Sequence, residues 1–559
     1  LGDTARIDSL LVVWPDGRYQ RLTDVAIDRT LTVRASEATG RLPRGLDAAA
    51  GVYPLFEDVT DRVAPGYRHN ENEFFDFNRE PLIPHQLSRE GPALAVADVN
   101  GDGLDDIYLG GAKWQPGALL IQDPDGGFRS SSDGTFRADS LAEDVDALFF
   151  DANGDTHPDL YVVSGGNEFW GSVDALRDRL YLNDGDGSFA RAEGALPDFF
   201  ANGATVAASD FDGDGDNDLF VGSRVVAREY GRTPRSYLLR NDGTGRFSDV
   251  TAEVAPMLAE VGMVTSAVWL PGDAGGTPEL VIVGEWMPVR IFGVVEGRLV
   301  ERTEAAGLSG TEGWWNSVTS ADLNGDGLDD LVLGNLGLNS FIRASAEEPA
   351  RLYIHDFAGT GPPQQILTMY RNGVSHPVPG RDELIEAIPR LADRYPTYSD
   401  FGASRLEDIF SRQEIAAATV LEARQFASMI ALRREDGTFE VRPLPREAQF
   451  FPLYASQVAD FDADGAMDLL VAGNFHGVTP VRGRYDAGYG QLLRGARDGT
   501  FTPVAMESSG VHVDGEVRGL GVLRAAGGGR LVVVARNDDS PRFLRVREPG
   551  QRLTGDGAT

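Results

Sequence analysis

The chain contains no cysteine, no long hydrophobic run and no excess of basic residues. Without cysteine, neither disulfide bonds nor thiolate metal sites can stabilise the fold. No apolar run approaches the roughly 20 residues of a transmembrane helix, so we expect no membrane span in this chain. Its 559 residues include 51 Lys and Arg against 86 Asp and Glu. The formal net charge of −35 argues against nucleic acid as a partner, because phosphate groups would be repelled.

What the sequence does contain is an aspartate-rich loop of nine residues, repeated five times. The copies begin at Asp98, Asp151, Asp210, Asp322 and Asp460, and the first reads Asp-Val-Asn-Gly-Asp-Gly-Leu-Asp-Asp. Oxygen side chains stand at positions one, three, five and nine, and glycine permits a tight bend between them in most copies. This arrangement of oxygen ligands suits a hard cation such as calcium.

We therefore predict about five structural calcium ions, one in each loop. Magnesium fits less well, because it prefers rigid octahedral sites that keep several waters. An EF-hand is excluded, because it needs Glu at position 12, where the first loop has Leu109 within a predicted strand. In each loop the seventh residue is expected to contribute its backbone carbonyl, and the other four their side-chain oxygens. The predicted ligands are Asp98, Asn100, Asp102, Leu104 and Asp106; Asp151, Asn153, Asp155, His157 and Asp159; Asp210, Asp212, Asp214, Asp216 and Asp218; Asp322, Asn324, Asp326, Leu328 and Asp330; and Asp460, Asp462, Asp464, Ala466 and Asp468.

Each loop lies between two short apolar runs that read as buried strands. Two further strand-like runs follow, so that one repeat contains four strands, which is typical of a propeller blade. Two weaker repeats, at residues 268–284 and 519–535, keep the strands but lack the acids. Five repeats plus two predict an all-β fold, a seven-bladed β-propeller of four-stranded blades. Residues 55–60 resemble a fourth strand, and we expect them to complete the last blade and so cover an exposed strand edge.

The wide gap between the fourth and fifth loops predicts a small helical insertion in the fifth blade, at residues 340–425. Residues 382–388 and 404–410 have helical spacing, and residues 419–426 also permit a helix. The first 35 residues are too few for a stable domain, so we expect them to be the end of a domain that begins before this sequence. The predicted organisation is a β segment at 1–35, a linker at 36–54, the propeller at 55–545 and a tail at 546–559.

The aspartate loops resemble the VCBS and FG-GAP repeats of calcium-binding β-propellers, a group that includes integrin α-chain heads. The motif Trp14-Pro-Asp-Gly-Arg18 resembles the end of an ASPIC/UnbV domain. Together these features are similar to large secreted or surface-tethered proteins of Bacteroidetes-type bacteria. The resemblance implies a bacterial protein that is extracellular or on the outer surface, with a role such as cell adhesion. It supplies an architecture more than an activity.

A second set of candidate residues follows the second strands or precedes the first strands of the repeats, on the face opposite the loops. Polar and aromatic groups around a central channel suit a carbohydrate or a peptide ligand. The alternative is that they fill the channel and brace neighbouring blades. Residues 69–76 with His85 also offer metal-ligand types, but a loop that covers the first blade explains them more simply. The candidate ligand-binding residues are Glu168, Arg224, Glu285, Trp286, Trp315, Asn316, Asn335 and His476.

These observations favour a non-enzymatic, calcium-stabilised extracellular module that binds a protein or glycan at the cell surface. The sequence shows no nucleophile elbow and no phosphate-binding loop. One alternative is a polysaccharide lyase or hydrolase that uses Glu168 and Glu285 as acid and base, since carboxylate pairs can cleave glycosides. Another is a structural subunit of an extracellular polymer, and homo-oligomerisation is left open.

Overall fold

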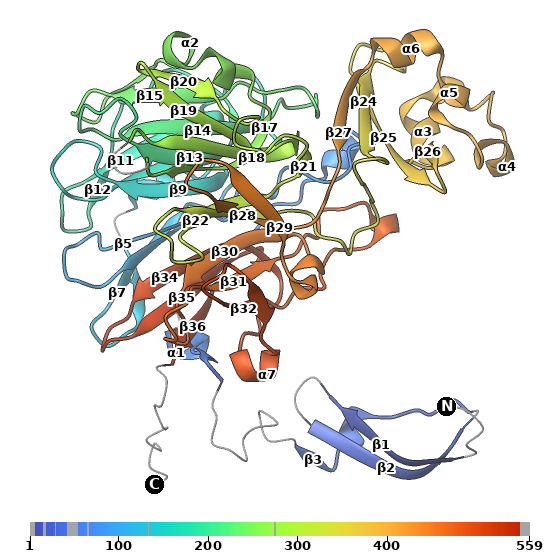
Figure 1. The fold of residues 1–559 in the computed structure, drawn as a ribbon, viewed down its shortest axis with the longest axis horizontal. Helices are drawn as coiled ribbons and strands as arrows, with labels where there is room; N and C mark the ends of the chain where they lie inside the picture. Colours follow the sequence, from blue (N-terminus) through green and yellow to red (C-terminus); the bar gives the residue numbers. More distant parts are fainter. Residues whose placement is uncertain are drawn as a thin grey trace.

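The computed structural model describes residues 6–14, 18–27, 29–41, 54–63, 66–131, 134–272 and 276–547. Within this part of the chain the fold is all-β and consists mainly of four-stranded antiparallel sheets, as the sequence predicted (Figure 1). No helix here combines the length and apolar character needed to cross a membrane. The predicted turn at 15–17, residues 42–53 of the predicted linker and residues 548–559 of the predicted tail lie outside the described residues.

The five repeats with aspartate loops each form one four-stranded sheet, in which the loop joins the first strand to the second. The position-nine aspartate begins the second strand and lies opposite the residue before the loop, as in the pair Ala321 and Asp330. The strands are β5 (Leu94–Ala97), β6 (Asp106–Leu109), β7 (Ala118–Gln122) and β8 (Phe128–Ser130); β9 (Asp144–Phe150), β10 (Asp159–Ser164), β11 (Arg179–Asn183) and β12 (Phe189–Arg191); β13 (Asn202–Ser209), β14 (Asp218–Val225), β15 (Tyr237–Asn241) and β16 (Phe247–Asp249); β22 (Ser317–Ala321), β23 (Asp330–Gly334), β28 (Met429–Arg433) and β29 (Phe439–Pro443); and β30 (Leu453–Ala459), β31 (Asp468–Gly473), β32 (Gln491–Gly495) and β33 (Phe501–Pro503).

The two acid-poor repeats also form sheets. In one of them the short strand β21 pairs with β18 in addition to the four main strands. The other consists of three consecutive strands and β4, which comes from far earlier in the chain. The strands are β17 (Met263–Leu270), β18 (Glu279–Met287), β19 (Arg290–Val295), β20 (Arg298–Glu301) and β21 (Gly313–Trp314); and β34 (Glu516–Arg524), β35 (Arg530–Asn537), β36 (Arg542–Val546) and β4 (Phe56–Asp58).

Strand β4 completes the last sheet, which confirms the prediction for residues 55–60. It pairs antiparallel with β36, and Phe56 lies opposite Val546. The Phe56 ring is buried and meets Phe461 edge to face, with ring centroids 5.1 Å apart. Hydrophobic side chains of neighbouring sheets pack together, and the first strands contact one another in the order β5, β9, β13, β17, β22, β30 and β34. Strand β34 in turn contacts β5.

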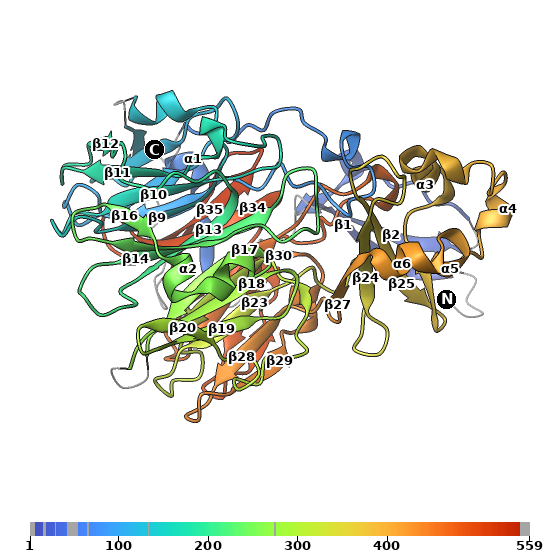
Figure 2. The same ribbon diagram turned by 90° about the horizontal axis from the view of Figure 1, so that it is seen from above.

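In the sequence, a separate sheet and four helices are inserted between β23 and β28. These two strands nevertheless pair directly with each other. Its strand order is β26-β25-β24-β27, and the whole unit projects from one side of the molecule (Figures 1 and 2). The prediction of a helix at 419–426 is wrong, because residues 419–423 form a strand that pairs with β24. The elements are β24 (Ala350–His355), β25 (Gln364–Arg371), β26 (Val374–Pro377), β27 (Thr419–Ala423), α3 (Arg381–Ala387), α4 (Tyr398–Phe401), α5 (Leu406–Ile409) and α6 (Arg412–Ala417).

Residues 66–92, which we call the covering segment, follow helix α1 (Thr60–Val63) and cross the ends of the sheets opposite the aspartate loops. Asp76 is buried and organises this segment by accepting hydrogen bonds from the Leu87 and Ser88 backbone N–H groups at 3.0 and 3.1 Å. Asn167 at the end of β10 also donates to Asp76, at 2.9 Å. The segment is thereby fixed to the sheets.

At the N-terminal side, β1 (Arg6–Val13), β2 (Arg18–Ala26) and β3 (Gly40–Arg41) form a three-stranded antiparallel sheet. Strands β1 and β2 are the two strands expected on either side of residues 15–17.

Candidate metal sites and the opposite face

The five aspartate loops share one pattern of internal hydrogen bonds. In each loop, Oδ2 of the position-one aspartate accepts a hydrogen bond from the backbone N–H of position six, at 2.8 to 3.1 Å. Oδ1 of the position-five aspartate accepts one from the N–H of position seven, at 2.8 to 3.0 Å. The backbone of the loop therefore makes the same turns in all five repeats.

Two loops keep this conformation although a glycine is replaced. Thr156 at position six of the second loop has φ 72°, and Ala463 at position four of the fifth has φ 59°. Both values lie in the left-handed region that side chains with a Cβ rarely adopt. Since the hydrogen bonds of these loops match those of the others, the replacements add local strain without changing these backbone turns.

The aspartate at position nine has a role that the sequence analysis missed. Asp330 is buried, and its Oδ2 accepts a hydrogen bond from the Leu323 N–H at 3.0 Å, while its Oδ1 accepts one from the Arg433 N–H on β28 at 2.7 Å. Asp106, Asp159 and Asp468 make equivalent contacts. This carboxylate therefore ties its loop to the third strand. In sequence the only trace is an aspartate that opens a buried strand.

The third and fifth loops each gather three acids closely enough to hold one ion. Asp210, Asp212 and Asp218 place one carboxylate oxygen each within 4.8 Å of the others, and so do Asp460, Asp462 and Asp464. Oδ2 of the buried Asp218 has no hydrogen-bond partner among the described residues. The remaining loops have Asn at position three, so an amide oxygen replaces one carboxylate. Such an all-oxygen donor set fits calcium, which would neutralise the acids and cross-link each loop when bound.

Without a bound cation, the position-nine carboxyl groups are harder to ionise than free ones. Burial raises the pKa of Asp218 to about 7, and the pKa values of Asp106, Asp159 and Asp330 to about 6. A divalent ion beside a carboxylate opposes such a shift, because it favours the ionised form.

Two of the loops contain an extra acid, and each is matched by an arginine. Asp212 and Asp462 occupy position three, where the other loops have Asn. Nε of Arg240 on β15 lies 2.8 Å from Asp212 Oδ2, and Nε of Arg494 on β32 lies 2.7 Å from Asp462 Oδ2. At positions one, three, five and nine, three loops carry three acids, and the other two carry four acids of which one is paired with an arginine. In the three Asn-containing loops, the third-strand residue at the same register is aliphatic: Ile121, Leu182 and Leu432.

Replacing both arginines should strengthen calcium binding at two of the five sites. The Arg240→Leu, Arg494→Leu variant loses one competing cation at each site. Arg240 competes with calcium for Asp212, and Arg494 competes for Asp462. We expect affinity at these two sites to rise about tenfold, roughly 1.4 kcal/mol each, as Coulomb attraction near a protein surface allows. Titration of calcium-free protein against a chromophoric chelator measures this.

The matched control for this titration is Arg351→Leu, which removes an ion pair with Glu422 far from any loop. Its calcium affinity should equal that of the parent chain. Unchanged or weaker affinity in the double variant would show that the arginines do not compete with calcium.

On the opposite face, Glu285 is the centre of a buried polar network. Its carboxylate lies 2.7 Å from Arg224 Nη2 and 3.0 Å from His85 Nε2, and it accepts a hydrogen bond from the Tyr230 hydroxyl. Burial alone would raise its pKa, but the charges of His85 and Arg224 lower the pKa of Glu285 to about 2. Burial disfavours the charged form of His85, yet Glu285 raises the His85 pKa above its ordinary value. The covering segment is thus pinned to the sheets by a buried ion pair.

Three of the candidate ligand residues brace the structure from within. The Trp286 indole N–H donates to the Tyr230 hydroxyl at 2.9 Å, and the Trp315 indole N–H donates to the Thr311 carbonyl at 3.0 Å. The Asn335 Oδ1 accepts from the Leu336 N–H at 2.8 Å. All three side chains are buried, so none of them presents a surface to a ligand.

Of the remaining candidates, Glu168 and Arg224 are also buried, whereas Asn316 and His476 are partly exposed. Arg224 and Asn316 line a central cavity of about 140 Å³, and the Nδ2 atom of Asn316 has no hydrogen-bond partner among the described residues. Glu168 pairs with Lys113 and with Asn72 of the covering segment. His476 is partly exposed, with Nδ1 3.3 Å from Glu516 Oε2.

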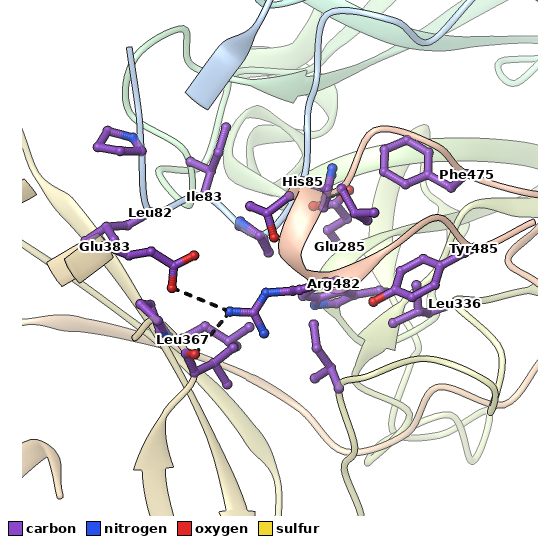
Figure 3. Close-up of a pocket in the computed structure, with 18 of the residues that line it drawn as sticks. Leu82, Ile83, His85, Glu285, Leu336, Leu367, Glu383, Phe475, Arg482 and Tyr485 are labelled. Carbon is purple, nitrogen blue, oxygen red and sulfur yellow. Dashed lines mark hydrogen bonds and ion pairs between the residues drawn. The ribbon is translucent and has the colours of Figure 1, made fainter. Parts of the chain in front are cut away.

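Glu285 and Asn316 also line a smaller cavity of about 40 Å³, where the covering segment meets the sheet with four helices (Figure 3). Arg482 lies beside it, donates to the Val378 carbonyl at 3.0 Å and approaches Glu383 at 4.0 Å. The sequence analysis did not single out Arg482 or the residues of the central cavity beyond Arg224 and Asn316. Nothing in their local pattern separates them from surface residues.

Family models match three parts of the chain. An FG-GAP-like repeat matches residues 98–162 and 151–221, and an FG-GAP repeat matches residues 314–340. A model described as ASPIC and UnbV matches residues 1–40. The matched residues have the pattern of FG-GAP repeats and of an ASPIC and UnbV segment. Both resemblances drawn from the sequence are confirmed, and the matched FG-GAP repeats include four of the five aspartate loops.

Solved structures show a distant likeness to this chain. BBS1N, crystallised in complex with ARL6DN, is 10% identical and aligns over 89% of this chain and 99% of its own, with a TM-score of 0.40. The V. cholerae biofilm matrix protein Bap1 is 11% identical over 84% of this chain and 89% of its own, with a TM-score of 0.35. The Dos1 propeller is 9% identical over 85% and 98%, with a TM-score of 0.37. The comparison with curated proteins finds no match.

Proposed function

We propose that this FG-GAP repeat protein is a calcium-stabilised extracellular module that binds a protein or glycan, in adhesion or in surface assembly. The observation that carries the proposal is the set of five aspartate loops with one conformation, two of which bring three carboxylates within ligand distance of one another. FG-GAP repeats in four-stranded sheets are the framework of a binding or adhesion module rather than of a known catalytic site.

The architecture that we propose is a seven-bladed propeller at residues 55–545. Its support is the cyclic series of contacts among the first strands of seven sheets, together with β4 as the outer strand of the last one. Residues 340–425 would then be an insertion in the fifth blade, since β23 and β28 pair across them. In such a ring each blade is covered on both faces by its neighbours.

The proposed calcium sites support an extracellular or outer-surface location. The resemblance to bacterial surface proteins adds a bacterial origin to this proposal. Extracellular calcium modules bind with dissociation constants of roughly 10⁻⁴ to 10⁻³ M, which a cytoplasm does not saturate. Five ions would also take over the stabilising role that disulfide bonds have in many secreted proteins, because this chain has no cysteine.

The geometry disfavours the enzymatic alternative built on Glu168 and Glu285. A general acid at neutral pH needs a raised pKa, whereas Glu285 has a pKa of about 2 and both of its oxygens are engaged. Glu168 is buried and paired with Lys113. Both carboxylates therefore act as anchors of the covering segment.

An array experiment separates binding from catalysis. The labelled, calcium-loaded chain should bind one class of probe on a printed array of glycans and extracellular proteins, without releasing reducing ends or unsaturated sugars from the glycans. Sugar release would establish the enzyme instead. Absence of binding to every probe, or filaments in the calcium-loaded sample, would overturn the proposal in favour of another role such as a polymer subunit.

A further inference from the structure

A groove on the face opposite the aspartate loops has the features of a ligand site. It lies between the β9–β12 sheet and the β13–β16 sheet and has a volume of about 650 Å³. Its inner end is lined by Asn202 and Ser223, and its outer end by Asp249 at the end of β16. Small-molecule sites typically measure about 300 to 1,000 Å³, so the groove is of suitable size.

An exposed indole ring forms one wall of the groove. Trp170 is 52% exposed, although tryptophan usually buries most of its surface. The Arg228 guanidinium lies 3.5 Å from the centre of its ring, and the Arg79 guanidinium lies 5.5 Å away. Phe200, also in the lining, is held in a similar way by Arg177 at 4.3 Å. The aromatic surfaces are therefore fixed in place before any ligand arrives, which reduces the entropy cost of binding.

Polar groups without partners lie at the inner end. The side chains of Asn202 and Ser223 are more than nine-tenths buried. Asn202 Oδ1 and Ser223 Oγ have no hydrogen-bond partner among the described residues, while the Asn202 amide nitrogen reaches only the Val225 carbonyl at 3.5 Å. A buried polar atom without a partner costs about 1 to 3 kcal/mol. Both atoms are closed to solvent, so the hydroxyl groups of a ligand would recover this free energy only as the inner wall of the groove opens to them.

We infer that this groove binds a neutral oligosaccharide. A sugar ring has apolar C–H faces that stack on aromatic rings and hydroxyl groups that pair with amide, hydroxyl and carboxylate groups. An acidic glycan is disfavoured, because the chain has a net charge of −35 and the arginines at the groove are already engaged with rings or with Asp198 and Asp249. The inference rests on the proposed binding function and names its ligand class and position.

Calorimetry on the full, calcium-loaded chain tests the groove. The probes are neutral tetrasaccharides of glucose in α- and β-linkage, of mannose and of N-acetylglucosamine. We expect at least one to bind, with affinity reduced more than tenfold by Trp170→Ala and several-fold by Asn202→Ala. Trp114→Ala is the matched control, because Trp114 is equally aromatic, 69% exposed and outside the groove lining. Melting curves establish that the variants are folded.

The outcomes distinguish this inference from the proposed function. If no neutral tetrasaccharide binds, or if Trp170→Ala and Asn202→Ala bind as the parent does, the groove proposal is overturned. Binding of array proteins without any neutral glycan would leave the proposed function intact and refute this ligand class. A peptide whose binding depends on Trp170 would also refute it, and would identify the groove as a peptide site.

Discussion

Removal of calcium is expected to lower the melting temperature of this protein by roughly 10 °C. At about 2 mM calcium and a dissociation constant of about 0.2 mM, each bound ion stabilises the folded state by about 1.4 kcal/mol. Five ions would contribute about 7 kcal/mol, a large part of the stability of an ordinary domain. The physical reason is that each loop holds three to five acids within nine residues, and these repel one another when no cation is present. Differential scanning calorimetry with and without EGTA measures the shift.

Two controls make this experiment specific. Excess magnesium should restore little of the lost stability. Asp326→Ala removes one acid from the fourth loop and should abolish about a fifth of the calcium-dependent shift, in proportion to one site of five. Asp436→Ala changes an exposed acid that only caps the turn at Thr438, and should leave the calcium-dependent shift as it is. A melting temperature that EGTA does not change would refute the calcium proposal.

The substitution Phe56→Ala is expected to cost about 3 to 5 kcal/mol of unfolding free energy. Phe56 is 2% exposed and fills the space between β4 and the ring of Phe461 in the fifth aspartate loop. Its loss leaves a cavity and loosens β4, which covers the edge of β36. Urea unfolding in saturating calcium gives the change directly.

The matched control is Phe75→Ala, a phenylalanine of the covering segment that is 55% exposed. Its effect should stay within about 0.5 kcal/mol, as for most surface substitutions. Equal stability of the two variants would mean that β4 is not needed for the fold. Increased self-association of Phe56→Ala, measured by light scattering, is a further expected result, because a freed strand edge pairs with other chains.

The features predicted well from sequence are those that depend on residues close together in the chain. The nine-residue loops and the apolar runs beside them depend on a few adjacent residues, and Phe56 belongs to a segment whose pattern repeats that of other outer strands. Residues 419–426 show the limit. Their composition permits a helix, but the backbone of β27 pairs with β24, about 70 residues earlier, and this pairing decides the structure.

The candidate sites were predictable to a lesser extent. The loop acids were visible as a motif, whereas the pairing of Arg240 with Asp212 depends on the register between the loop and the third strand. The sequence does not distinguish Trp315 from Trp170, yet Trp315 is buried in the core and Trp170 is exposed at a groove. Tryptophan serves both purposes, so only tertiary structure separates a brace from a ligand platform.

The pairing of β4 with β36 has a mechanical consequence. Because the two strands are antiparallel, Phe56 lies beside Val546, so the chain enters β4 and leaves β36 at the same end of this strand pair. Tension applied between the N-terminal and C-terminal sides would peel the strands apart one hydrogen bond at a time, instead of shearing all of them together. A force applied through only the N-terminal or only the C-terminal side would not pull on the pairing of β4 with β36. The protein should therefore resist force far better when it is attached through one terminus than when it is stretched between both termini.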